Sequence, residues 1–146
     1  MGKGVNIIIT DDKNRVLVLK RIPKSKLSPS LWNLPGGNVK KGENLNQAVI
    51  REVKEETNLE LKSLGKPFYI YYYPKTTVYA IKTRVIKGKI FLNKEHSKFR
   101  WVSKDDWENL KYTPSGLATL KKFLNNQPKG VASRPYGASR ALKVKS

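Results

Sequence analysis

The stretch GNVKKGENLNQAVIREVKEETNL, residues 37–59, decides how this chain folds and what it binds. It holds four of the eleven acidic residues in a 146-residue chain whose formal net charge is +19. Carboxylates gathered this closely repel one another unless a cation lies between them. The stretch therefore predicts a site for a divalent metal ion. Its four acids are Glu43, Glu52, Glu55 and Glu56.

A helix over residues 44–57 would bring three of these carboxylates to one face. Glu52, Glu55 and Glu56 stand at i, i+3 and i+4, within a single turn. The same helix carries an apolar stripe, and its geometry places Glu52 and Glu56 beside that stripe. Carboxylates at the edge of a core need a metal or a hydrogen-bonding partner. The competing interpretation is a solvated face paired with basic neighbours. The stripe is Leu45, Val49 and Val53, and the neighbours are Arg51, Lys54 and Lys62.

The residue types favour a hard metal ion. The ligands would be oxygen atoms, and the chain has no Cys and a single His, which favours Mg²⁺ or Mn²⁺ over zinc. Just upstream, Pro35-Gly36-Gly37 and Gly42 are expected to form a loop that a metal or ligand can approach closely. The Gly36 carbonyl is a further candidate ligand.

The spacing of these residues resembles the Nudix box, a motif of a hydrolase family. One position departs, since Asn58 stands where the family usually has glycine. Asn is second to Gly in tolerating the left-handed conformation that ends many helices. The resemblance covers residues 4–125 and includes the segments Trp32-Asn33-Leu34-Pro35-Gly36-Gly37, Glu95-His96 and Phe99-Arg100-Trp101-Val102. The matching box positions are Gly37, Glu43, Arg51, Glu52, Val53, Glu55, Glu56 and Leu59.

The resemblance implies a Mg²⁺-dependent hydrolase and assigns roles to residues. Glu52 is the first choice as general base and Glu95 the second, while Arg51 would orient the glutamates. Gly37 and Glu43 would support the box, Glu43 by bracing its loop. His96, the only histidine, is a weaker candidate for catalysis than its neighbour Glu95. The implied metal ligands are Gly36, Glu52, Glu55, Glu56 and Glu95.

The resemblance leaves the substrate open within one reaction class. With its short length and single domain, the chain most resembles the MutT type of the family. Enzymes of this type convert a nucleoside triphosphate into a nucleoside monophosphate and pyrophosphate. ADP-ribose, dinucleoside polyphosphates and a triphosphorylated or capped RNA 5′ end are alternatives, and a non-catalytic nucleotide sensor is a minor one. The excess of Lys and Arg attracts polyanions such as RNA, although a lysine-rich thermophile surface would have the same composition.

Four residues are candidates for contact with the substrate. An arginine at the end of a strand could meet a phosphate, and aromatic rings could stack on a base. The competing interpretation is that aromatic residues in strands belong to the core or to cross-strand pairs. The candidates are Arg21, Trp32, Tyr71 and Tyr73.

The predicted fold is α+β, with a mixed sheet between helices, and the resemblance implies an α/β/α sandwich. One domain is expected over residues 1–126, with a hairpin at its start and a helix opened by Thr113-Pro114 at its end. Residues 127–146 form a basic tail expected to be flexible. The chain has no apolar run of membrane-spanning length and no signal peptide, so a cytoplasmic protein is expected, monomer or homodimer. Strands are expected at residues 5–10, 16–21, 61–64, 68–73 and 77–86, with a short one near Trp32.

Overall fold

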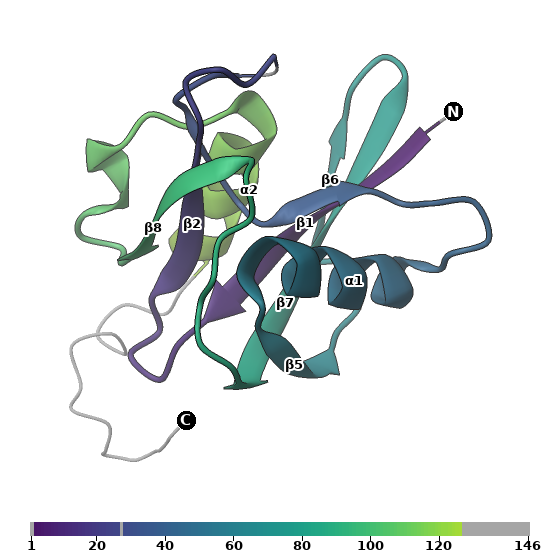
Figure 1. Ribbon diagram of the computed structural model, residues 1–146, viewed down its shortest axis with the longest axis horizontal. Coiled ribbons are helices and arrows are strands. Elements are labelled where there is room, and N and C mark those ends of the chain that lie inside the picture. The colour runs from purple at the N-terminus through teal and green to yellow at the C-terminus, as the bar shows by residue number, and fades with distance from the viewer. Residues whose placement is uncertain (1, 27, 127–146) are drawn as a thin grey trace.

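A mixed sheet of eight strands lies between two helices in the computed structural model, which describes residues 2–26 and 28–126 (Figure 1). The predicted α+β sandwich is confirmed. The basic tail at residues 127–146 lies outside the described residues. The strands are β1 (Gly2–Thr10), β2 (Val16–Arg21), β3 (Trp32–Asn33), β4 (Gly36–Asn38), β5 (Glu60–Leu64), β6 (Tyr69–Tyr72), β7 (Thr76–Lys87) and β8 (His96–Val102). The helices are α1 (Leu45–Thr57), the short 3₁₀ helix η1 (Trp107–Asn109) and α2 (Pro114–Asn125).

Strand β1 is the centre of the sheet. It pairs in parallel with β7 along its whole length, and antiparallel with β4 near its start and with β2 at its end. The predicted hairpin between β1 and β2 is confirmed by the pair Thr10 and Val16. Its turn is held by Asp11, whose Oδ1 accepts hydrogen bonds from the Lys13 and Arg15 amides. The strand order β3-β2-β1-β7-β5 leaves β4, β6 and β8 as additional pairings.

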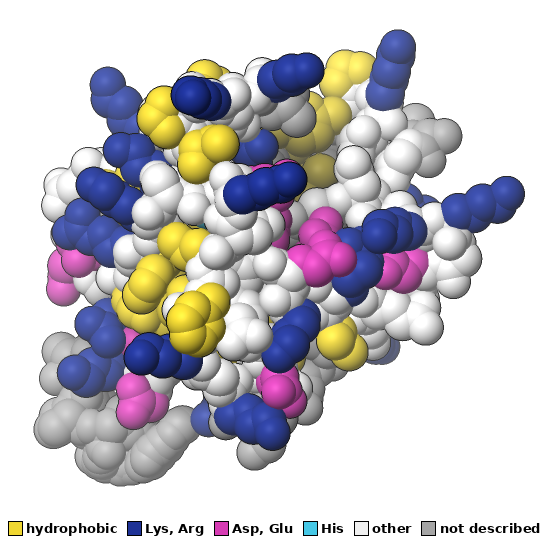
Figure 2. Space-filling view, in the orientation of Figure 1, with side chains coloured by type: hydrophobic (Ala, Val, Ile, Leu, Met, Phe, Trp, Pro, Cys, Tyr) yellow, Lys and Arg dark blue, Asp and Glu magenta, His cyan; other side chains and the backbone are white. Residues whose placement is uncertain are grey.

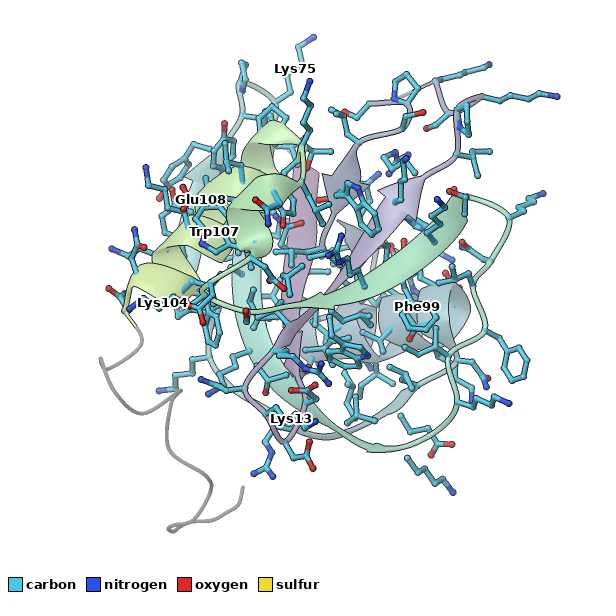
Figure 3. All side chains as sticks on the ribbon, turned by 90° about the vertical axis from the view of Figure 1, so that its left-hand side faces the viewer. Lys13, Lys75, Phe99, Lys104, Trp107 and Glu108 are labelled. Atoms are coloured by element: carbon cyan, nitrogen blue, oxygen red, sulfur yellow. The ribbon has the colours of Figure 1, made fainter. Side chains whose placement is uncertain are left out.

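Two apolar cores lie on opposite faces of the sheet. Alternation along β1 sends Val5, Ile7 and Ile9 toward α1 and Ile8 toward α2. Helix α1 contributes Ala48, Val49 and Val53 to the first core. The second core includes Trp107 of η1, which lies beside α2 (Figure 3). The sheet therefore holds the two helices in fixed positions on either side of β1.

Helix α1 starts and ends where its sequence predicts. Asn44 caps its start in a reciprocal capping box with Gln47. Asn58 ends it in the left-handed conformation, with φ of 68°. The Asn58 amide group also donates to the Lys89 carbonyl, at 3.2 Å. Asparagine therefore takes the place of the family's usual glycine without losing the helix exit.

Replacing Asn58 with Ala is expected to lower the free energy of unfolding by about 1 kcal/mol, because a Cβ without a compensating polar group strains a left-handed residue. Asn58→Gly should stay within about 0.5 kcal/mol of the wild type, since glycine adopts this φ freely. Urea unfolding curves of the three proteins measure the difference. Equal stability of the Ala and Gly variants would contradict the argument.

Two features of the fold differ from the sequence prediction. The segment expected to be a glycine loop is partly strand, because Gly36–Asn38 pairs with β1 as β4. The short helix η1 was not predicted. Helix α2, by contrast, begins as expected, with the Thr113 hydroxyl accepting from the Gly116 amide and Pro114 at the first helical position. Across residues 2–26 and 28–126, no helix is both long and apolar enough to cross a membrane.

Candidate active site

Three glutamates of α1 differ sharply in exposure, as the position of the apolar stripe predicts. Glu56 is buried, with an exposed fraction of 6%. The side chain of Glu52 is 12% exposed and that of Glu55 is 51% exposed. The alternative of a solvated helix face therefore applies to Glu55 but not to Glu56.

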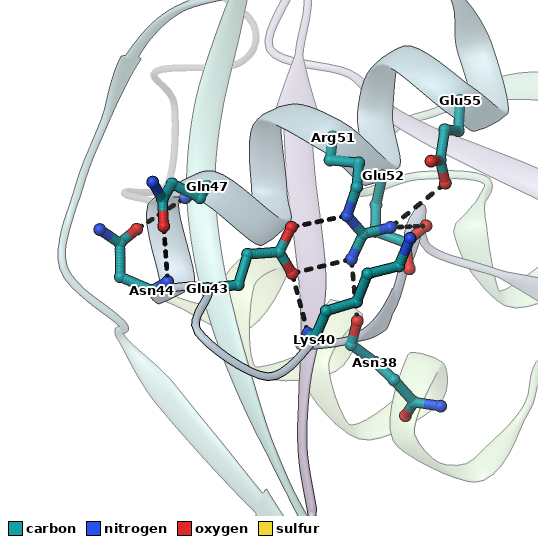
Figure 4. Close-up of polar contacts among 8 residues, drawn as sticks. All are labelled: Asn38, Lys40, Glu43, Asn44, Gln47, Arg51, Glu52 and Glu55. Carbon is teal, nitrogen blue, oxygen red and sulfur yellow. Dashed lines mark hydrogen bonds and ion pairs between the residues drawn. The ribbon is translucent and has the colours of Figure 1, made fainter.

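Arg51 connects the carboxylates of the box (Figure 4). Its Nε and Nη2 donate to the two oxygens of Glu43, at 2.6 and 3.0 Å. Its Nη1 lies 3.2 Å from Glu55 and 3.4 Å from Glu52. Nη2 also donates to the Asn38 carbonyl in β4, at 3.0 Å. One guanidinium thus holds the box loop, β4 and two glutamates in a single arrangement, which fits an orienting role.

Glu43 makes contacts that fit its predicted supporting role. It accepts two hydrogen bonds from Arg51 and one from the Lys40 amide, at 2.8 Å. The hydrogen bond from Arg51 is the main reason that the pKa of Glu43 falls to about 2. Its oxygens are thereby committed to bracing the loop between β4 and α1.

The two more buried glutamates have few neutralising partners. Burial raises the pKa of Glu56 to about 8, and the Gly36 amide, at 2.9 Å from Oε1, opposes this only in part. Burial likewise raises the pKa of Glu52 to about 7, with Arg51 opposing and Glu55 adding to the rise. Carboxylates whose pKa burial raises in this way suit a hard divalent cation, whose charge would restore their ionised form. The residues therefore fit Mg²⁺ or Mn²⁺.

These pKa values predict that the metal-free protein loses stability as pH rises from about 4.5 to about 8. Above pH 4.5 both carboxyls ionise in the unfolded chain, but the folded protein keeps the Glu52 proton up to about pH 7 and the Glu56 proton up to about pH 8, so the unfolding free energy falls over this range. The part of the loss that falls between pH 6.5 and 8.5 should be about 1–3 kcal/mol. Thermal melts with EDTA measure it, and Mg²⁺ should raise Tm most at pH 8.5. A Glu56→Gln protein that keeps the full slope would contradict the assignment.

Glu95 and His96 reach the same site from the start of β8. One ligand atom each from Glu56, Glu95 and His96 lies within 4.8 Å of the other two. Glu95 is exposed, whereas His96 is 6% exposed. Burial, with the charge of Arg21 in support, lowers the pKa of His96 to about 4. The structure therefore places the predicted Glu95 beside the box glutamates and adds a histidine to the cluster.

A pocket of about 590 Å³ opens beside β4. Its wall includes Gly36 and Gly37, and the Gly36 amide bonds Glu56. The volume lies in the range of pockets that hold nucleotide-sized ligands. Polar side chains make up much of the lining. They include Asn6, Ser28, Asn33, Asn38, Thr76, Thr113 and Ser115.

The structure brings some predicted substrate contacts to this pocket and not others. Arg21 and Tyr73 line it. Tyr71 does not line the pocket but contacts Tyr73, with the two rings edge-on and their centroids 4.8 Å apart. Trp32 is not among the described lining residues and packs against the second core. The competing core interpretation of the aromatics thus fits Trp32 best.

Sequence reasoning missed Asn33 as a pocket residue. Its Oδ1 accepts hydrogen bonds from the Leu34 amide at 2.8 Å and the Thr113 hydroxyl at 2.9 Å. Because the Leu34 amide can only donate, these bonds fix the oxygen and leave the NH₂ group of Asn33 to face other partners. Its position in the Trp32-Asn33-Leu34-Pro35 segment was the available signal.

Comparisons with known proteins agree with this geometry. A family model described as a NUDIX domain matches residues 1–123. A protein named 8-oxo-dGTP diphosphatase from Buchnera aphidicola is 36% identical over 115 residues, which are 75% of this chain and 83% of that protein. An RNA pyrophosphohydrolase from Pelagibacter ubique is 40% identical over 66 residues, 45% of this chain and 40% of its own length.

Solved structures show the same fold. The crystal structure of a MutT protein from Methanosarcina mazei Go1 has a TM-score of 0.67 at 26% identity, covering 88% of this chain and 95% of that one. A MutT structure from a study of Aliivibrio salmonicida and Vibrio cholerae has a TM-score of 0.75 at 20% identity, covering 86% and 98%. The second likeness concerns the fold alone.

Proposed function

Because the chain belongs to the Nudix family and is thus a hydrolase of phosphoanhydride bonds, we propose that it converts a nucleoside triphosphate into a nucleoside monophosphate and pyrophosphate. The observation that carries this proposal is the position of the pocket relative to the carboxylates. Gly36 and Gly37 line the pocket, while the Gly36 amide bonds Glu56. A nucleoside held in the pocket would extend its phosphates past β4 to Glu52 and Glu56.

The residues divide the work between holding, orienting and proton transfer. Bound Mg²⁺ would neutralise the phosphate oxygens and make water a better nucleophile. The proposed ligands are the Gly36 carbonyl, Glu52, Glu55, Glu56 and Glu95, with Mn²⁺ as the alternative ion. Arg51 fixes Glu52 and Glu55 relative to the box loop. Glu52 is the proposed general base, since bound metal would keep its carboxylate ionised and Arg51, 3.4 Å away, would hold it in place to accept a proton.

Two groups in the pocket would recognise the nucleoside. The NH₂ group of Asn33, for which no acceptor is found among the described residues, can donate to an acceptor on the base, such as guanine O6 or N7. Tyr73, 37% exposed and supported by Tyr71, offers a ring for stacking. The relative from Buchnera aphidicola is named for a purine nucleoside triphosphate, which is consistent with this choice.

Replacing Asn33 with Ala is expected to raise KM for the preferred triphosphate by about 5- to 100-fold, the effect of losing one base-specific hydrogen-bonding group. The value of kcat should change less, because Asn33 lies in the pocket and not among the box glutamates. Steady-state kinetics with purine and pyrimidine substrates measure both constants. A variant with unchanged KM for every base would remove Asn33 from recognition.

The second candidate substrate is the 5′ end of RNA. The observation that favours it is the charge: Lys and Arg side chains are spread over the face that carries α1, while Asp and Glu gather in few places (Figure 2). Such a field would attract the RNA body, with binding that weakens as salt rises. The relative from Pelagibacter ubique is named for this reaction.

The test is phosphate and pyrophosphate release across a substrate panel with Mg²⁺. The panel contains nucleoside triphosphates, ADP-ribose, dinucleoside polyphosphates and 5′-triphosphorylated RNA, with Glu55→Gln as the control enzyme. Release of pyrophosphate from triphosphates, lost in the control, would support the proposal. Turnover of RNA alone, or of ADP-ribose alone, would replace it by the corresponding alternative, and silence on all members would favour the nucleotide sensor.

A further inference from the structure

We propose that Glu56, Glu95 and His96 form a mixed carboxylate and imidazole position for a divalent transition ion such as Mn²⁺, within the metal site of the proposed function. The position uses a ligand from outside the box. One potential ligand atom from each side chain lies within 4.8 Å of the others. Around a six-coordinate ion with bonds of about 2.1 Å, adjacent ligands are about 3.0 Å apart and opposite ligands about 4.2 Å apart, so side-chain movements of about 1–2 Å close the site.

A bulge in β8 sets the backbone position of His96. It is the first residue of β8 and pairs with Arg21 of β2, whereas the next pair joins Lys20 to Lys98. Ser97 is therefore an extra residue, a bulge of the kind that redirects a neighbouring side chain. His96 is buried at 6% exposure, and Glu56 is equally buried. Two side chains of the cluster are therefore buried, whereas Glu95 is exposed.

Hydrogen bonds from Asn93 fix which ring nitrogen is available. The Glu95 backbone amide donates to Asn93 Oδ1 at 3.2 Å, so this atom is the amide oxygen. His96 Nδ1 lies 3.1 Å from the same oxygen and must carry the ring proton. Nε2 then keeps its lone pair, and it has no hydrogen-bond partner among the described residues. A histidine that binds a metal through one ring nitrogen usually donates its other ring N–H to an oxygen such as a carbonyl.

The ligand set has a consequence for the choice of metal. Mg²⁺ prefers oxygen ligands and keeps its waters, whereas first-row transition ions accept imidazole nitrogen as well. Glu52 and Glu55, which lie against Arg51, offer oxygen alone. The site would therefore contain an oxygen-only part suited to Mg²⁺ and one mixed position that favours Mn²⁺ over Mg²⁺.

Pulsed electron paramagnetic resonance of the Mn²⁺-loaded protein tests the inference. The chain contains a single histidine, so a coupling to imidazole nitrogen, measured on untagged protein, identifies His96. The expected result is that coupling in the wild type and its loss in His96→Gln. Mn²⁺ should bind about 10-fold or more weakly to His96→Gln, with Mg²⁺ affinity changed by less than about 2-fold.

The controls separate this inference from the proposed function. Glu60→Gln, on β5, removes an exposed acid and should leave the coupling unchanged. If His96→Gln does not fold, the wild-type spectrum alone decides, because absence of imidazole coupling at saturating Mn²⁺ overturns the inference. If the imidazole coupling is present but the protein hydrolyses no nucleotide, the inference holds and the proposed function is wrong. If the protein hydrolyses a nucleotide but shows no coupling, the proposed function holds and the inference is wrong.

Discussion

Glu52→Gln is expected to lower kcat by about 10²- to 10⁴-fold at saturating Mg²⁺, the usual loss when a general base is removed. The amide keeps the size of the side chain but cannot accept a proton from water. The Glu52 side chain is 12% exposed, and its desolvation outweighs the attraction of Arg51, so the substitution also removes a charge that the folded protein disfavours. The variant should therefore fold normally and melt at or above the wild-type temperature. Single-turnover kinetics and a thermal melt measure the two effects.

The controls for Glu52→Gln distinguish the base from a general loss of charge. Glu60→Gln changes an exposed acid whose two lysine contacts are both at 3.9 Å, so it should retain wild-type kcat. Glu95→Gln tests the second candidate base. Near-normal turnover by Glu52→Gln together with a large loss in Glu95→Gln would transfer the role to Glu95, which also lies beside Glu56.

The helix of the box could be predicted from the sequence because its signals are local. The i, i+3, i+4 spacing of its glutamates, its apolar stripe and its Asn58 exit all act within a few residues. The structure confirms each of them. The contrast between buried Glu56 and exposed Glu55 follows from the same helical geometry, so the burial of the site was predictable before its partners were known.

The pocket could not be predicted because contacts distant in sequence build it. Asn33 is fixed by Thr113, 80 positions away, and Asn6 donates to Thr119, 113 positions away. The sequence predicted Thr113 as a helix cap, a role that depends on neighbouring residues alone. Its contact with Asn33 depends on the tertiary fold and could not be predicted in the same way. The same limit applies to His96, since its approach to Glu56 depends on the pairing of β8 with β2.

The two glycines before the box also needed the structure for their explanation. The sequence suggested a loop whose glycines let a metal or ligand approach the backbone closely, but both residues belong to β4 and neither has a positive φ. Glycine is needed at both positions because there is no room for a Cβ atom. A Cβ on Gly37 would overlap the carboxylate of Glu52, and a Cβ on Gly36 would overlap the backbone carbonyl of Val5 in β1.

This difference predicts opposite consequences for two adjacent Ala substitutions. In Gly37→Ala the obstacle is the end of a flexible side chain, so Glu52 can rotate away at little cost in stability. The displaced carboxylate is the proposed general base, and a misplacement of about 1 Å can reduce turnover about 10²-fold. Gly37→Ala should therefore fold with nearly wild-type Tm and lose at least that much of kcat.

Gly36→Ala should instead lose stability, because the obstacle is the backbone of the central strand and cannot rotate away. The expected cost is about 3 kcal/mol, the upper end for overpacking, or a fall in Tm on the order of 10 °C. Urea unfolding and kcat measured on both variants give a matched comparison. A stable Gly36→Ala, or a fully active Gly37→Ala, would show that β4 can move away from its neighbours. The position of Glu52 would then depend on Arg51 and not on the close approach of β4 to α1.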